Sequence, residues 1–148
     1  MIFCGKSRFD LFATAKFFLL AGSMLAKDEA VIIIHTQTSG VITGGNLQVT
    51  DKASMTIINS DIDIQGSIIY NSTVPFTVIK GSVLLISGKP FFISQNGHFT
   101  IDNLSEVLIT FGSIIVGDTS LLEVTLGGKA TVRNGNIILN NNARLLAK

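Results

Sequence analysis

The 148-residue sequence predicts an all-β protein, and within that class a single-stranded β-solenoid (a parallel β-helix) of about six short coils. The residues after position 30 are rich in Ile, Val, Thr, Phe and Asn, which favours strands and turns over helices. A short phrase that begins with glycine also recurs along the chain, and its units are too small to bury an apolar face alone. Units of this kind are stable when they stack on one another.

The repeated phrase consists of a glycine, a small polar residue, an apolar strand, a polar turn and a second apolar strand. Its six copies begin at Gly45, Gly66, Gly81, Gly97, Gly112 and Gly135. From Gly66 to Gly112 the copies follow one another at nearly equal intervals of about 15 residues. The intervals that begin at Gly45 and Gly112 are longer. We therefore expect coils of two strands, with equivalent strands about 4.8 Å apart in parallel sheets.

The apolar runs within these units do not alternate with polar residues. Ile114–Val116, Val83–Ile86 and Ile137–Leu139 are continuous, which indicates strands that are packed over much of their surface. An antiparallel meander closed into a sandwich or barrel is the alternative fold, because the Asn-Gly pairs in "FFISQNGHFTI" and "ATVRNGNIIL" are strong hairpin signals. The solenoid is preferred because a meander needs no such regular repeat.

Residues 1–26 have the layout of a secretory signal. Basic residues precede an apolar run at Phe17–Leu20, and small residues follow at Ala21–Ser23 and Ala26. The alternative is a hydrophobic helix that is retained and that caps the core or anchors the chain to a membrane surface. Lys16 leaves too few apolar residues for a full transmembrane span. We predict a signal peptide or N-terminal hydrophobic helix over 1–26 and a β-solenoid domain over 27–148.

Charge and cysteine content exclude several classes of function. The formal net charge is +1 and only 14% of residues are charged, so nothing in the sequence attracts nucleic acid. Cys4 is the single cysteine, and it can form neither an internal disulfide nor a Cys-based zinc cluster.

The candidates for a chemical site are two carboxylates and two histidines. Asp61 and Asp63 lie two positions apart on a predicted strand and so face the same side, where paired acids could bind calcium or a glycan. The simpler interpretation is a solvent-facing edge, with Ile62 and Ile64 inside. His35 and His98 have no partner at a ligand spacing, and no nucleophile, phosphate or dinucleotide motif is present. We therefore predict no enzyme activity, no cofactor and no metal.

The segment "GGNLQVTDKASMTIINSDIDIQGSI" resembles the coil phrase of right-handed β-helix passengers in filamentous-haemagglutinin-type and autotransporter adhesins. The resemblance spans about Gly44 to Leu146, although the coils are shorter and no autotransporter barrel is present. It implies an exported adhesive protein at the cell surface. The second family that the sequence resembles is the bactofilins, which are short β-helical cytoskeletal polymers. An intracellular bactofilin-like polymer is therefore an alternative expectation.

The C-terminal stretch "NGNIILNNNARLLAK" is still in the repeat phrase. A solenoid end exposes unpaired backbone and apolar side chains. We expect this end to stack on another subunit, so that the protein is a homo-oligomer or filament, through Ile137, Leu139, Leu145 and Leu146. The predicted function is that of a structural or adhesive component of an exported assembly. The alternative is a β-helix that binds or cleaves carbohydrate through Asp61 and Asp63, and contact with glycans or a membrane fits either interpretation.

Overall fold

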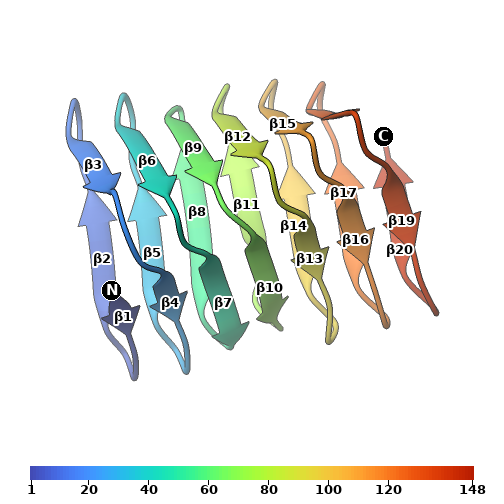
Figure 1. Cartoon of the computed structure of the whole chain (residues 1–148), viewed down its shortest axis with the longest axis horizontal. Helices are drawn as coiled ribbons and strands as arrows, with labels where there is room; N and C mark the ends of the chain where they lie inside the picture. The colour runs from blue at the N-terminus through green and yellow to red at the C-terminus, as the bar shows by residue number, and fades with distance from the viewer.

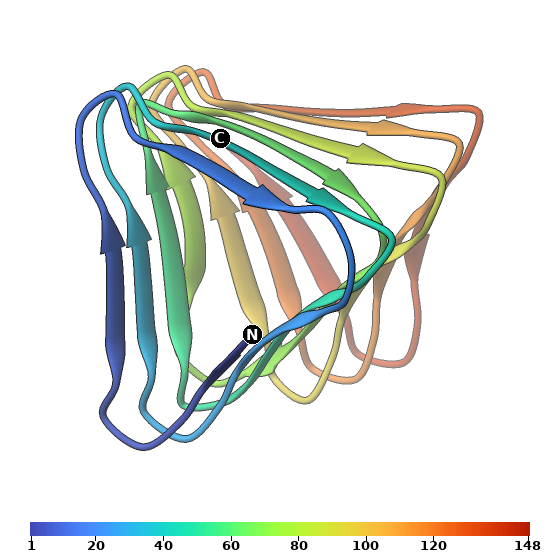
Figure 2. The same ribbon diagram turned by 60° about the vertical axis from the view of Figure 1, so that its left-hand side comes forward.

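A computed structural model describes residues 1–148 as one parallel β-solenoid (Figure 1). Twenty strands form three parallel sheets and there is no helix. The sheets are the three sides of a triangular tube, which Figure 2 shows obliquely with the N-terminal end in front. Every strand pair is parallel, which confirms the solenoid and excludes the antiparallel meander.

Successive strands along the chain belong to sheets A, B and C in turn. Sheet A contains β1(Ile2–Phe3), β4(Met24–Ala26), β7(Leu47–Asp51), β10(Ile68–Ser72), β13(Phe91–Ile93), β16(Ile114–Val116) and β19(Ile137–Leu139). Sheet B contains β2(Arg8–Leu11), β5(Val31–Ile34), β8(Ser54–Ile58), β11(Phe76–Ile79), β14(His98–Ile101), β17(Leu121–Val124) and β20(Arg144–Ala147). Sheet C contains β3(Lys16–Leu19), β6(Ser39–Thr43), β9(Asp61–Gln65), β12(Val83–Ser87), β15(Glu106–Thr110) and β18(Lys129–Arg133).

One coil is one strand from each sheet, so coil 1 is β1–β3 and coil 6 is β16–β18, with β19 and β20 beginning a seventh. The expected number of about six coils is confirmed, but the expected coil of two strands is wrong. Ile2 lies beside Leu25, and Leu25 lies beside Gln48. The usual coil is therefore 23 residues long, and hydrogen bonds between neighbouring coils also join residues that are 23 positions apart.

Coil 3, β7–β9, is shorter than the others. Leu47 pairs with Ile68 in sheet A, which is a step of 21 residues, and hydrogen bonds between these coils span 21 residues too. In sheet C the step from Ile62 to Leu84 is 22 residues, like that from Ser60 to Ser82 beside it. One residue is therefore missing at the corner between sheets B and C and one at the corner between sheets C and A.

The interior is a column of apolar side chains that runs the length of the tube. Twenty-eight buried residues form one cluster. At its centre Phe76, Phe91 and Phe99 contact one another edge to face or tilted, with ring centroids 4.7–6.3 Å apart. The strands do alternate: Ile114 and Val116 are fully buried whereas Ile115 is only partly buried. The continuous apolar runs arise because sheets A and C also carry apolar residues on their outer faces, such as Ile115 and Leu85.

The prediction of an N-terminal helix is wrong. Residues 1–26 form β1–β4, which complete coil 1 and begin coil 2. The apolar residues of this segment recur with the period of a strand, because Phe9 and Leu11 face the core on β2 while Asp10 between them faces outward. No helix capable of spanning a membrane is present.

The two Asn-Gly pairs form corners of the tube. Asn96 and Asn134 adopt left-handed backbone angles, with φ of 68° and 57°. Asparagine tolerates this conformation better than most residues. The pairs turn the chain from one sheet to the next, where a hairpin would have returned it antiparallel to the same sheet.

Candidate functional site

Exposed apolar side chains gather at the C-terminal end of the tube, where β19 and β20 present unpaired strand edges. Ile137, Leu139 and Leu145 are 40%, 45% and 45% exposed. They extend interior columns, since their neighbours in the preceding coil are fully buried: Ile114, Val116 and Leu122. Of the four predicted interface residues, Leu146 lies elsewhere, because it pairs with Glu123 on the outer face of sheet B.

The N-terminal end differs because a layer of aromatic rings lies across it. Phe3, Phe9 and Phe17 come from the three strands of coil 1 and are partly buried against the core. The centroids of Phe3 and Phe9 are 5.1 Å apart and those of Phe9 and Phe17 are 5.9 Å apart. One end of the solenoid is thus aromatic and the other aliphatic. The sequence interpretation missed this layer because it placed these residues outside the solenoid.

The corner between sheets B and C is filled by buried hydroxyl groups. Thr38, Ser60, Ser82 and Ser105 occupy equivalent positions in four successive coils and are at most 4% exposed. Ser82 Oγ donates to the Ile79 carbonyl at 2.6 Å and accepts the Ser60 N–H at 3.3 Å. Each coil is therefore linked to the next through side chain and backbone. We call this column the serine corner.

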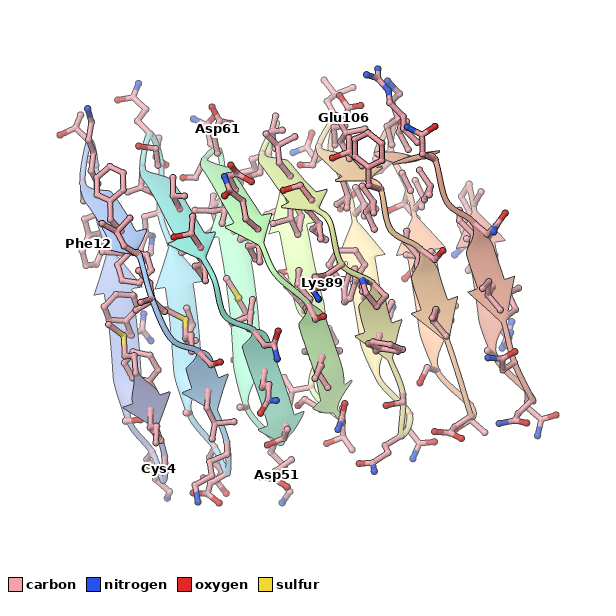
Figure 3. All side chains as sticks on the ribbon, viewed as in Figure 1. Cys4, Phe12, Asp51, Asp61, Lys89 and Glu106 are labelled. Carbon is pink, nitrogen blue, oxygen red and sulfur yellow. The ribbon has the colours of Figure 1, made fainter.

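The corner between sheets C and A is built by close approach of backbone. Gly45, Gly66, Gly112 and Gly135 occupy one column, where an added Cβ would lie 1.6–2.4 Å from a carbonyl oxygen of the preceding coil. No side chain fits at these positions in the observed backbone. We call this column the glycine corner. Between Gly66 and Gly112 the column carries Lys89 instead of glycine (Figure 3).

The corner between sheets A and B uses carboxylates. Asp28, Asp51 and Asp118 each accept a backbone N–H from the preceding coil, at 2.9–3.2 Å. The donors are Gly5, Asp28 and Gln95. Every carboxylate in this column therefore caps a turn of the backbone.

Asp61 and Asp63 lie on the same outer face of β9, as predicted, while Ile62 and Ile64 are buried. Asp63 accepts a hydrogen bond from the Gln65 side chain at 3.1 Å. Their neighbours in sheet C are Ser39 and Val41 on one side and Val83 and Leu85 on the other, so no further acid joins them. The structure does not bring the pair together with other groups that could form a hydrolytic or calcium site, and no group of three metal-ligating residues is present.

Both histidines have an acidic neighbour from the adjacent coil. His35 Nε2 lies 3.0 Å from Asp10, and His98 Nε2 lies 3.0 Å from Glu123. These partners are 25 residues away in sequence, so they could be found only once the length of the coil was known. Hydrogen bonds from Arg8 and His35 lower the pKa of Asp10, and the same contact with Asp10 raises the pKa of Arg8.

Two other reactive or polar side chains lie apart from these corners. Cys4 is exposed and unpaired near the corner between β1 and β2. Tyr70 is fully buried in β10, and its hydroxyl has no hydrogen-bond partner. Burial raises the pKa of this phenol well above its usual range.

No protein-family model matches the chain, and no curated protein or solved structure shows significant similarity to it. The geometry of the solenoid is therefore the basis for proposing a function.

Proposed function

We propose that the protein is a non-enzymatic structural or adhesive module that assembles end to end, with the coils of one copy stacking on those of another. The observation that carries this proposal is the aliphatic C-terminal end. Ile137, Leu139 and Leu145 continue columns that are fully buried one coil earlier, so a further coil would bury them in the same way.

The opposite end supplies a suitable partner surface. The Phe3, Phe9 and Phe17 layer belongs to strands β1–β3, which pair on one side only. Parallel strands that continue the register would give backbone hydrogen bonds in addition to apolar burial. Head-to-tail contacts of this type are heterologous and do not close, so they extend into filaments.

The experiment is a measurement of mass against protein concentration, by analytical ultracentrifugation or light scattering, on the chain of residues 1–148. We expect assemblies whose size grows with concentration. Leu145→Lys should abolish the growth because it places a charge where the next coil would stack. Leu104→Lys is the matched control, since Leu104 is 75% exposed at a side corner. A monomer at micromolar concentration, or equal behaviour of the two variants, would contradict the proposal.

Export to the cell surface is the second part of the proposal. It is supported only by the basic and apolar layout of residues 1–26. Head-to-tail stacking needs residues 1–26, because cleavage after this segment would remove β1–β4 together with Phe3, Phe9 and Phe17. The two parts of the proposal are therefore compatible only if the segment is retained on export. Mass spectrometry of the native N-terminus tests this: a chain that begins at Met1 is expected, and a chain that begins after residue 26 would contradict stacking through the aromatic layer.

A further inference from the structure

The solenoid has one recess, and it lies on the glycine corner. Its volume is about 330 Å³ and no apolar side chain lines it. The lining residues come from coils 1 to 4: Ser23, Gly44, Gly45, Asn46, Gln65, Gly66 and Lys89. Figure 3 places Lys89 at this corner, between β12 and β13.

The recess arises because coil 3 is short. At the glycine corner of the neighbouring coils a residue with positive φ precedes the column: Gly44, Gly88, Phe111 and Asn134. Coil 3 lacks that residue, because its step from Ile62 to Ile68 is one shorter than the step from Gly40 to Leu47 in coil 2. The corner at Gly66 is therefore drawn in between two longer corners, which form the walls.

The second departure from the repeat occurs at the same place. Lys89 occupies the column in coil 4 where the corners before and after it carry glycine. In a regular corner its Cβ would meet the carbonyl oxygen of the preceding coil, as an added Cβ would at Gly45 or Gly135. The shortened corner at Gly66 explains how a side chain is accommodated here. Lys89 makes no ion pair, so its ammonium group is free at the wall of the recess.

The other polar groups at the recess are mainly available as donors. Ser23 Oγ accepts the Asn46 N–H at 3.1 Å, which leaves its hydroxyl proton free. Asn46 Oδ1 accepts the Ser67 N–H at 3.3 Å, which leaves the amide NH₂ free. Gly66 is buried, and its N–H donates to no acceptor in the chain. Buried backbone N–H groups are rarely left without a partner. Asp63 on the adjacent face of sheet C is already bonded to Gln65.

We propose that this recess binds one oxyanion group, a carboxylate or sulfate, carried by an acidic sugar residue of a glycan. Lys89 is the counter-ion, and the Ser23 hydroxyl, the Asn46 amide and the Gly66 N–H are hydrogen-bond donors. A charged donor with several neutral donors favours an anion over a neutral ligand. The volume of the recess exceeds that needed for a small ion and leaves room for the sugar ring. The hydroxyl groups of the ring would donate to the exposed backbone of Gly44 and to the Gln65 side chain.

The experiment is isothermal titration calorimetry of the full chain with glucuronate, glucose and inorganic sulfate. We expect glucuronate to bind, and glucose to bind at least tenfold more weakly because it lacks the carboxylate. Lys89→Gly should weaken glucuronate binding at least tenfold, since a hydrogen bond to a charged group contributes about 1.5–3 kcal/mol. This variant restores the glycine of the column and is expected to fold. Lys89→Arg should retain binding, and Lys52→Gln, at an exposed lysine of another corner, should leave it unchanged.

Each remaining outcome counts against all or part of the proposal. Equal affinity for glucuronate and glucose, or an unaltered affinity in Lys89→Gly, would overturn the anion site. Sulfate binding as tightly as glucuronate would show that the site takes a free oxyanion and would overturn the sugar. No heat from glucuronate or sulfate would overturn the site altogether.

Discussion

The serine corner and the glycine corner meet the same requirement by different means. At each, the chain must turn between two sheets while its backbone lies against the coil below. The serine corner places a small hydroxyl inside, and the hydroxyls of Ser60, Ser82 and Ser105 each bond the backbone of the preceding coil. The glycine corner places nothing inside, and the backbone of one coil approaches the carbonyl of the preceding one directly.

The difference decides where a recess forms on the surface. Coil 3 is one residue short at both corners, yet only the glycine corner opens into a recess. At the serine corner the Ser60 side chain, which is 4% exposed and bonded to neighbouring backbone, fills the position. A corner without side chains has nothing that can occupy the space. In coil 3 the missing residue therefore leaves a recess at the corner that lacks side chains, and none at the corner that Ser60 fills.

Substitutions in the glycine corner should have the largest effect on stability. Gly45→Ala is expected to destabilise the fold by about 3 kcal/mol, because its Cβ would lie 1.8 Å from the Gly22 carbonyl oxygen and backbone must move. Gly5→Ala is the matched control. Gly5 has positive φ but nothing within 4 Å of an added Cβ, so a cost of about 1 kcal/mol is expected from backbone strain alone. Urea unfolding of both variants provides the comparison, and equal losses would show that close approach does not constrain this corner.

Substitutions in the serine corner should cost less. Ser82→Ala removes a bond to the Ile79 carbonyl and leaves the buried Ser60 N–H without that acceptor, so a loss of about 1–2 kcal/mol is expected. Ser120→Ala is the control, because Ser120 is equally buried but its hydroxyl has no partner. It should be neutral or slightly stabilising. A loss in Ser120→Ala equal to that in Ser82→Ala would mean that packing, rather than hydrogen bonding, accounts for the serine corner.

Tyr70 carries a buried hydroxyl that, unlike those of the serine corner, has no hydrogen-bond partner. Its side chain is fully buried and its hydroxyl is unpaired. Tyr70→Phe should therefore stabilise the protein by about 1 kcal/mol, because a buried hydroxyl without a partner retains its desolvation cost. Thermal unfolding measures the change. A fall in the melting temperature would show that the hydroxyl is satisfied in solution.

Backbone strain within the glycine corner should produce a smaller effect. Phe111 adopts φ of 58° and is 69% exposed, so it has strain and little compensating burial. Phe111→Asn is expected to stabilise the fold by about 0.5 kcal/mol, since asparagine tolerates this conformation better. Chemical denaturation is sensitive enough to detect this change, and a clear loss would indicate that the ring packs on the corner.

The smallest expected effect concerns a charged contact between coils 1 and 2. Arg8 and His35 lower the pKa of Asp10, so the folded state favours the ionised carboxylate. The stability that this contact adds is present above the unfolded pKa, about 3.9, and is lost as the pH falls through the lower folded pKa. Asp10→Asn should flatten the stability profile below about pH 4. An unchanged acid limb would show that Asp10 is not coupled to folding.

The sequence was sufficient to predict parallel stacking from its recurring turns, and the shared face of Asp61 and Asp63 from their spacing. The expected number of coils also agrees, but the units from which it was counted are not the coils. It misled on the coil itself. The evenly spaced glycines lie at different corners: Gly66 between sheets C and A, Gly81 between B and C, and Gly97 between A and B. Each step covers two sides of the triangle, and three steps return to the first corner at Gly112. Since glycine occurs at all three corners, the spacing alone did not separate them.

The N-terminal segment and the recess were inaccessible for other physical reasons. Lys16 and Phe17–Leu20 form part of a basic and apolar pattern that fits a signal or a helix, and only pairing with β6 shows that β3 is a strand. The recess depends on one missing residue relative to neighbouring coils. Such a deletion is visible only once the register of adjacent coils is fixed.

The register of the stacked coils, including the short step across coil 3, determines the corners, the end surfaces and the recess. Thr56 and Thr77 are 21 residues apart and lie side by side on sheet B, with their hydroxyl oxygens 3.1 Å apart. In a Cys4→Ser background, the pair Thr56→Cys and Thr77→Cys should oxidise readily to a disulfide, because directly opposed residues are within bridging distance. The pair Thr56→Cys and Ile79→Cys, which would lie side by side if coil 3 had the usual length, should not. Preferential cross-linking of the second pair, or of neither, would contradict the register on which the corners, the end surfaces and the recess all depend.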